Sequence, residues 1–217
     1  ERRALLVQHG FAPDYLDERP ACAACGDSGY VGAEPCDCLK KRYAARLTRE
    51  LSTILPIGDQ NFEAFRLDYY SDVPDSRLGM SARENMEYNL SVCRAYADTF
   101  SPQAKNLLLY GSTGLGKTFL SSCIAGVVSR KGYSVAYDTA IRIFGSYESV
   151  KFTAPDAAEA ARRVRKYEQS DLLIVDDLGT EMATSFTVSA FYGLLAGRLM
   201  RRGPMIVSTN LLPAEFE

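Results

Sequence analysis

The chain has 217 residues, 47% of them hydrophobic, which allows one full-sized hydrophobic core with a small appendage. The formal net charge of −2 excludes a basic field over the whole molecule, so binding to nucleic acid or acidic lipid has to come from local patches. No run of eighteen apolar residues and no secretory signal pattern occurs, which predicts a cytoplasmic protein that has no membrane partner.

The N-terminal part is predicted to be a small, loop-rich module followed by a helix. Apolar residues up to Leu16 fit a short helix and turn. Residues 39–55 carry apolar side chains every three or four positions, which predicts one amphipathic helix. Between these segments, four cysteines lie within seventeen residues: Cys22, Cys25, Cys36 and Cys38.

These four thiolates are enough for a closed tetrahedral Zn²⁺ site. In a reducing compartment, clustered cysteines are more often metal ligands than disulfides. An iron–sulfur cluster is the alternative metal group, although its usual cysteine spacings differ, and free structural cysteines are a third interpretation. Because few apolar residues lie nearby, we expect the metal to replace a core, so that chelation unfolds the module.

The rest of the chain alternates strand-like and helical segments. Pro56, Gly58 and Pro74 are loop signals between the first helix and a second helix expected at residues 80–100. Short apolar runs follow at 106–110, 133–137, 172–175 and 205–208, separated by segments long enough for helices. This alternation predicts an α/β fold with a mostly parallel sheet.

Residues 111–118 satisfy the pattern G-x-x-x-x-G-K-[ST] between a predicted strand and a predicted helix. Successive backbone N–H groups of such a loop surround phosphate oxygens, Lys117 reaches the β- and γ-phosphates, and Thr118 places its hydroxyl on Mg²⁺. An ordinary glycine-rich turn is the alternative. The candidate nucleotide-binding residues are Gly111, Ser112, Thr113, Gly114, Leu115, Gly116, Lys117, Thr118 and Phe119.

Two further segments supply polar groups where apolar strands end. Asp176 and Asp177 follow an apolar run, so Asp176 is expected to hold Mg²⁺ and Asp177 to act as a general base on an attacking water. An acidic pair at a strand end also occurs by chance. Asn210 follows the last apolar run, where its amide could orient that water, although an ordinary turn asparagine is the alternative. The candidate catalytic residues are Lys117, Asp176, Asp177 and Asn210.

These residues together resemble the AAA+ ATPases, and among them the bacterial replicative-helicase loaders of the DnaC/DnaI type with an IstB-like ATP-binding core. The resemblance covers the cysteine module, residues 61–65, the P-loop, Asp-Asp-Leu-Gly-Thr-Glu at 176–181, and residues 208–211. The catalytic acid, commonly Glu in AAA+ proteins, is Asp177 here, which could slow hydrolysis.

The resemblance implies a three-layer α/β/α P-loop core of the ASCE type that hydrolyses ATP to ADP with Mg²⁺ and self-associates when ATP binds. It also implies that the N-terminal module grips a replicative DNA helicase, which the protein delivers onto single-stranded DNA. Phe62 and Phe65 are expected beside the base. The arginine finger, the sensor-2 arginine and the lid are expected beyond residue 217, so ATP hydrolysis by this fragment should be weak.

We therefore divide the chain into a zinc module and helix at 1–55, a linker and nucleotide-proximal segment at 56–78, and an AAA+ core at 79–217. Two other functions stay open: an IstB-like transposition helper, against which the cysteine module argues, and a nucleotide-gated adaptor with negligible hydrolysis. The basic run at 162–166 is either a DNA contact or a solvated helix face balanced by Glu159 and Glu168. Arg198, Arg201 and Arg202 are expected at a solvated helix end, with a neighbouring subunit as the alternative.

Overall fold

The computed structural model describes residues 2–16, 20–76, 79–179 and 184–212. The chain forms two compact units, Glu1–Tyr43 and Ala44–Glu217, which divide within helix α2 (Asp37–Ser52). Within the described residues, no helix is both long and apolar enough to cross a membrane.

The first unit contains little regular structure before α2. Helix α1 (Arg2–Gln8) has no buried residue, and strands β1 (Tyr30–Val31) and β2 (Glu34–Pro35) form a two-stranded antiparallel hairpin. In the described part of this unit, the buried positions are Gly29 and Cys36. The described part of this unit therefore lacks an apolar core, as expected from its few apolar residues.

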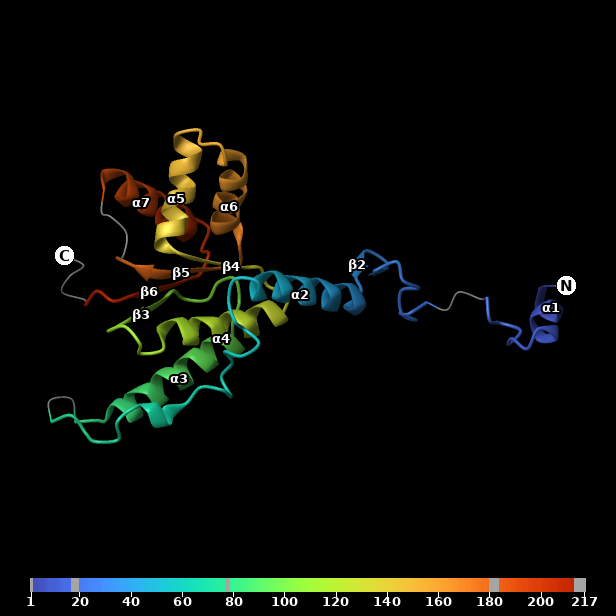
Figure 1. Cartoon of the computed structure of the whole chain (residues 1–217), viewed down its shortest axis with the longest axis horizontal. Coiled ribbons are helices and arrows are strands. Elements are labelled where there is room, and N and C mark those ends of the chain that lie inside the picture. Colours follow the sequence, from blue (N-terminus) through green and yellow to red (C-terminus); the bar gives the residue numbers. More distant parts are fainter. Residues whose placement is uncertain (1, 17–19, 77–78, 180–183, 213–217) are drawn as a thin grey trace. The chain divides into compact units, whose positions relative to one another are not determined.

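The second unit is built on a four-stranded parallel sheet in the order β3-β6-β5-β4. Figure 1 shows α3 and α4 on one face of this sheet and α5, α6 and α7 on the other. This arrangement confirms the expected three-layer α/β/α fold. The elements are η1 (Leu67–Tyr69), α3 (Ala82–Asp98), β3 (Leu107–Tyr110), α4 (Lys117–Arg130), β4 (Val135–Thr139), α5 (Ala140–Lys151), α6 (Ala157–Gln169), β5 (Leu172–Leu178), α7 (Ser185–Met200) and β6 (Met205–Thr209).

Strand β5 explains why both faces of the sheet are covered. Successive side chains of a strand point to opposite faces. Leu172 and Ile174 accordingly pack with α3 and α4, whereas Leu173 and Val175 pack with α5 and α7. A strand buried on both faces reads as a continuous apolar run rather than an alternating one, and that is how residues 172–175 read in the sequence.

Helix α3 starts where a capping box fixes it. The Ser81 hydroxyl accepts from the backbone N–H of Glu84, and the Glu84 carboxylate accepts from the backbone N–H of Ser81. At its other end, the Lys131 ammonium group donates to the carbonyls of Ala97 and Asp98. These contacts satisfy terminal groups that the helix itself leaves unpaired.

Arg198 is not at a solvated helix end, so that expectation was wrong. It is 1% exposed, and its guanidinium donates to the carbonyls of Tyr167 (3.0 Å), Ser170 (2.9 Å) and Pro204 (2.7 Å). Burial lowers its pKa to about 10. A guanidinium has five N–H donors, so this one side chain can hydrogen-bond carbonyls at the end of α6 and in the residue before β6. No sequence pattern reveals these contacts. Arg201 is exposed, as expected.

Candidate functional site

The P-loop joins β3 to α4, the context that the motif requires. Gly116 precedes α4 with φ +86°, a left-handed conformation that favours glycine. A Cβ atom there would lie 2.9 Å from the hydroxyl of Tyr70, which donates to the Leu115 carbonyl at 3.1 Å. Backbone conformation therefore favours glycine at this position, and a larger residue would displace Tyr70, whose hydroxyl contacts the loop.

A cavity of about 320 Å³ opens at the end of the sheet beside this loop. Its walls come from the P-loop, from the end of β5 and from the residue after β6. The lining residues are Thr113, Gly114, Gly116, Lys117, Thr118, Phe119, Asp177 and Asn210. Three segments that are far apart in the sequence thus meet at one cavity, and all eight residues were predicted from the sequence.

Lys117 and Asn210 are in direct contact. The Lys117 ammonium group donates to Asn210 Oδ1 at 2.7 Å and to the carbonyls of Gly111 (2.8 Å) and Ser112 (3.0 Å). Strand β6 lies between β3 and β5 in the sheet, so the residue that follows β6 is carried to the P-loop. This contact puts the amide of Asn210 within reach of whatever Lys117 binds.

The carboxylate of Asp176 is 2% exposed and accepts three hydroxyl hydrogen bonds. Thr118 Oγ1 and the Tyr137 hydroxyl donate to Oδ2, at 3.0 Å and 2.6 Å, and Ser208 Oγ donates to Oδ1. Burial, together with this hydrogen bond, raises the pKa of Tyr137 well above its usual range. The structure therefore brings Thr118 to Asp176, as expected, and adds Tyr137 and Ser208, which the sequence analysis missed.

The oxygens of Thr118 and Asp176 fit a Mg²⁺ ion. Mg²⁺ prefers oxygen ligands in octahedral geometry at about 2.0–2.1 Å, which sets neighbouring ligand oxygens about 2.9 Å apart. The 3.0 Å separation between Thr118 Oγ1 and Asp176 Oδ2 is close to this spacing. These two side chains are the residues that would hold the ion.

Phe62 and Phe65 do not share one environment. Phe62 is 6% exposed in the core, and the guanidinium of Arg94 lies 5.5 Å from its ring centroid. Phe65 packs edge-on against Phe119, with 5.3 Å between ring centroids, and its ring also lies beside Gly116. Of the two, Phe65 is the ring that packs against a cavity-lining residue, Phe119. The placement of Phe62 and Phe65 beside the base stays a prediction.

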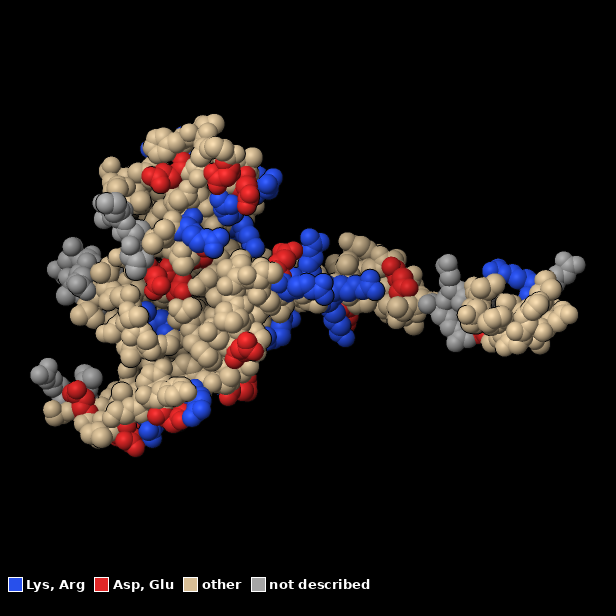
Figure 2. Space-filling model, in the orientation of Figure 1, with Lys and Arg blue, Asp and Glu red and all other residues tan. Residues whose placement is uncertain are grey.

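The basic residues 162–166 of helix α6 have two different environments. Arg163 is paired with Asp156 and Glu159 and donates to Ser146. Three other basic residues of the run are exposed and form no ion pair with any described residue: Arg162, Arg165 and Lys166. Figure 2 shows Lys and Arg side chains over α6. At positions i, i+3 and i+4 these cations share one face of the helix.

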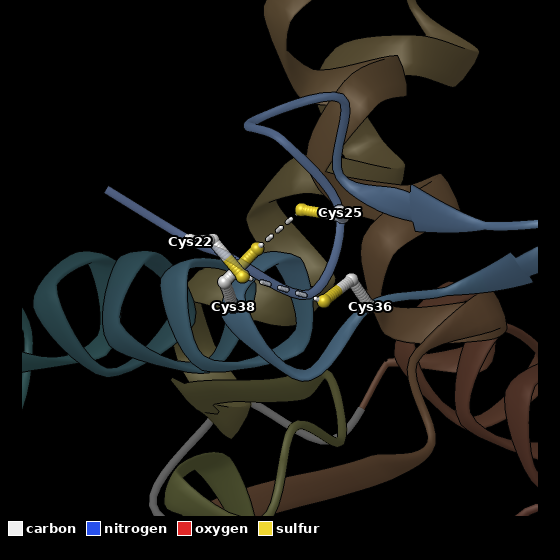
Figure 3. A group of neighbouring side chains, drawn as sticks. All are labelled: Cys22, Cys25, Cys36 and Cys38. Carbon is white, nitrogen blue, oxygen red and sulfur yellow. Dashed lines mark hydrogen bonds between the residues drawn. The ribbon is translucent and has the colours of Figure 1, made fainter. Parts of the chain in front are cut away.

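The four cysteines converge in the first unit (Figure 3). All four sulfur atoms lie within 4.8 Å of one another, with 3.7 Å between Cys22 and Cys36 and 3.4 Å between Cys25 and Cys38. A tetrahedral zinc with Zn–S bonds of about 2.3 Å has sulfur atoms about 3.8 Å apart. The donor set and its spacing therefore fit Zn²⁺.

Local turns place these thiols. The Asp27 carboxylate accepts from the backbone N–H groups of Ala21 and Cys22, both at 2.9 Å, which closes the first turn. The backbone N–H of Cys25 is the main cause that lowers the pKa of the Cys22 thiol to about 7. The thiolate is the metal-binding form, so this first turn favours a ligand at Cys22.

The sequence matches a protein-family model, described as "IstB-like ATP binding protein", over residues 89–217, which is more than half of the chain. The chain belongs to this IstB-like ATP-binding family. This IstB-like chain combines a P-loop with a parallel α/β/α core like that of AAA+ proteins, and it is related to the helicase loaders of the DnaC/DnaI type.

Two curated relatives of this IstB-like chain come from different settings. An ATP-binding protein of an insertion sequence in Mycobacterium tuberculosis is 25% identical over 92% of this chain and 74% of its own length. The replicative helicase loader DnaI of Bacillus subtilis is 27% identical over 67% of this chain. The match spans 44% of DnaI, less than half of that loader.

Solved structures agree on the fold. The DnaC helicase loader matches with a TM-score of 0.56 at 18% identity, covering 72% of this chain and 80% of that chain. Domain III of the replication initiator DnaA from Thermotoga maritima matches with a TM-score of 0.54 at 18% identity, covering 73% of this chain and 59% of that chain.

Residues Thr180 and Glu181 of the acidic motif lie outside the described residues.

Proposed function

We propose that this chain is an ATP-hydrolysing helicase loader that delivers a replicative DNA helicase onto single-stranded DNA. The observation that carries the proposal is the match to the loader DnaI over two thirds of this chain. The cavity supports the ATPase part, because a P-loop lysine, the carboxylate of Asp177 and an asparagine line it, and Asp176 accepts from the lining residue Thr118.

Each residue has a distinct role in this proposal. The backbone N–H groups of residues 111–118 and the N-terminus of α4 bind the phosphates, and Lys117 exchanges its carbonyl partners for phosphate oxygens. Thr118 and Asp176 hold Mg²⁺, which would neutralise charge that develops on the transferred phosphoryl group. Asp177 lines the cavity and accepts a proton from the attacking water, and Asn210 orients that water.

The same proposal assigns two further roles. Zn²⁺ held by Cys22, Cys25, Cys36 and Cys38 folds the N-terminal module, which grips the helicase. The unpaired cations of α6 contact the phosphates of single-stranded DNA, since local basic patches supply such contacts in a chain without an overall positive charge. ATP drives self-association, because neighbouring subunits of AAA+ proteins complete each other's sites.

A second function, the transposition helper, is favoured by a specific observation. The insertion-sequence relative leaves less than a tenth of this chain unmatched, so that match extends into the cysteine segment. The cysteine module is therefore a weaker argument against this function than its sequence alone suggests. A nucleotide-gated adaptor, which binds ATP and hydrolyses it negligibly, is the third candidate function.

The deciding experiment measures whether ATP makes this protein bind a replicative helicase. Purified full-length protein, Lys117→Ala and Lys105→Ala are each mixed with the helicase in ATP and in ADP. Lys105 is an exposed lysine outside the cavity, so its variant controls for loss of a positive charge. We expect binding in ATP for wild type and Lys105→Ala, and a loss of at least about tenfold for Lys117→Ala.

Each alternative gives a different result in that experiment. ATP-dependent binding to duplex DNA and to a transposase, without helicase binding, contradicts the loader and supports the transposition helper. Helicase binding that needs ATP but proceeds with no phosphate release supports the adaptor. Hydrolysis is followed as released phosphate in the presence of helicase and single-stranded DNA.

A further inference from the structure

A β-bulge sits where β5 reaches the cavity. Val175 of β5 pairs with Val207 of β6, and the next pair is Leu178 with Thr209. Asp176 and Asp177 therefore lie together opposite a single residue of β6, Ser208. A bulge of this kind bends a strand and re-aims a side chain, and bulges are frequent next to active sites.

The bulge allows both residues of the acidic pair to serve the same site. On a regular strand, two successive side chains point to opposite faces of the sheet, so only one of them could serve a site. Here Asp177 has φ +54°, a left-handed conformation that is uncommon for residues other than glycine. Asp177 lines the same cavity as Thr118, and Asp176 accepts from the Thr118 hydroxyl. Both acidic residues thus serve one site.

Ser208 joins the two residues of the bulge through one hydroxyl. Its Oγ accepts from the backbone N–H of Asp177 at 3.0 Å and donates to Asp176 Oδ1. Ser208 is fully buried, so water cannot replace either contact without a change in packing. Without this hydroxyl, neither of these two hydrogen bonds can form.

Tyr137 fixes the other oxygen of the same carboxylate. Its hydroxyl donates to Asp176 Oδ2 at 2.6 Å from β4, the strand on the far side of β5 from Ser208. The carboxylate is therefore held on both oxygens from both neighbouring strands. Rotation of the carboxylate about its own axis would break at least one of these bonds.

We propose that Ser208 and Tyr137 are positioning residues that set the orientation of the metal-binding carboxylate, with Ser208 also holding Asp177 in its cavity-facing conformation. The inference rests on the proposed roles of Asp176 and Asp177. Hydrogen-bond partners of metal ligands orient the ligand, and their loss typically costs about 10–100-fold in metal affinity or activity. Neither residue touches the nucleotide in this assignment.

The test compares ATP affinity with and without Mg²⁺ in the full-length protein. The variants are Ser208→Ala and Tyr137→Phe, each of which removes one hydroxyl. Ser122→Ala is the matched control, because Ser122 is also fully buried but its hydroxyl has no hydrogen-bond partner among the described residues. We expect both variants to lose about 10–100-fold in ATP affinity with Mg²⁺. In EDTA their ATP affinity should equal that of the control.

A second measurement needs neither metal nor nucleotide. Hydrogen exchange of the Asp177 backbone amide is measured by NMR in the metal-free protein. Ser208→Ala should exchange at least about tenfold faster there, because its amide loses the hydrogen bond that protects it. Tyr137→Phe and Ser122→Ala should leave this amide unchanged, since neither variant removes the Ser208 hydroxyl that accepts from it. A global loss of stability would instead accelerate exchange throughout the core.

Asp176→Asn tests the metal role of Asp176 separately from the positioning roles of Ser208 and Tyr137. If Asp176→Asn removes the effect of Mg²⁺ on ATP affinity while Ser208→Ala and Tyr137→Phe behave like Ser122→Ala, the positioning roles are wrong and the proposed site stands. If Asp176→Asn itself leaves the effect of Mg²⁺ intact, the proposed metal role and this inference fall together. Should Ser208→Ala not fold, Tyr137→Phe decides by the same comparison.

Discussion

Replacing Arg198 with methionine is expected to destabilise the second unit by about 3 kcal/mol. The change removes the guanidinium donors to the carbonyls of Tyr167, Ser170 and Pro204. The Pro204 carbonyl keeps a second donor, the backbone N–H of Leu173. Hydrogen bonds to a charged group contribute about 1.5–3 kcal/mol each, or about 4.5–9 kcal/mol for three. Burying the guanidinium lowers its pKa from 12.5 to about 10, which offsets about 3 kcal/mol.

The assay is thermal and urea unfolding of the full-length protein. For a chain of this size, about 3 kcal/mol corresponds to a Tm decrease of about 6–12 °C. Arg201→Met is the matched control, because Arg201 lies three residues on and is exposed. Its Tm should stay within about 2 °C of wild type, since surface substitutions usually change stability by less than about 0.5 kcal/mol.

The opposite outcome would be informative. Some buried charged networks can be replaced by apolar residues with no loss of stability or even a gain. If Arg198→Met is as stable as Arg201→Met, then desolvation of the guanidinium outweighs its hydrogen bonds and our reasoning is refuted. Arg198→Lys should fall between Arg198→Met and wild type, because a single ammonium group cannot span the carbonyls that NH1 and NH2 reach separately.

Three further predictions concern the zinc site, helix α3 and the P-loop. Metal analysis of the wild-type protein should find one Zn²⁺ per chain, and Cys25→Ser should abolish it; a full zinc content in Cys25→Ser would contradict the site. Removing the metal with a chelator should unfold residues 20–43, measured as faster hydrogen exchange of their amides. The backbone N–H of Ser81 lowers the pKa of Glu84 below 4.5, so its stabilisation is present above pH 4.5 and is lost as pH falls through the lower folded pKa. Urea midpoints should show this loss in wild type and a smaller one in Glu84→Gln. Gly116→Ala should lower the Tm more than Gly114→Ala, because both backbones are left-handed but only Gly116 lacks room for a Cβ atom; equal melting temperatures would show that the contact with Tyr70 yields.

The parts of the site that the sequence predicted are those encoded by contiguous residues. The P-loop motif specifies a strand, a turn and a helix N-terminus within one segment, so the motif alone predicts where Lys117 and Thr118 lie. Asp176 and Asn210 each follow an apolar run, and the carboxyl ends of parallel strands meet at one edge of a sheet. Their position relative to the P-loop therefore followed from strand type alone.

The parts that were missed depend on register and on packing. Tyr137 and Ser208 face Asp176 only because β4, β5 and β6 pair in one particular register, and no local pattern states that register. The acidic pair was predicted at the end of a strand, and β5 includes the pair and ends one residue later, at Leu178. Arg198 was misplaced because one cation in an apolar helix reads as exposed until its carbonyl partners are known.

The position of β6 sets the width of the nucleotide site. Neighbouring strands lie about 4.8 Å apart, so the strand that leads into the P-loop and the strand that carries the acidic pair are held about 9.6 Å apart by the strand between them. The sheet thus acts as a fixed spacer between the phosphate-binding loop and the carboxylates. Side-chain substitutions can change what lines this gap, but only a change of strand order can change its width.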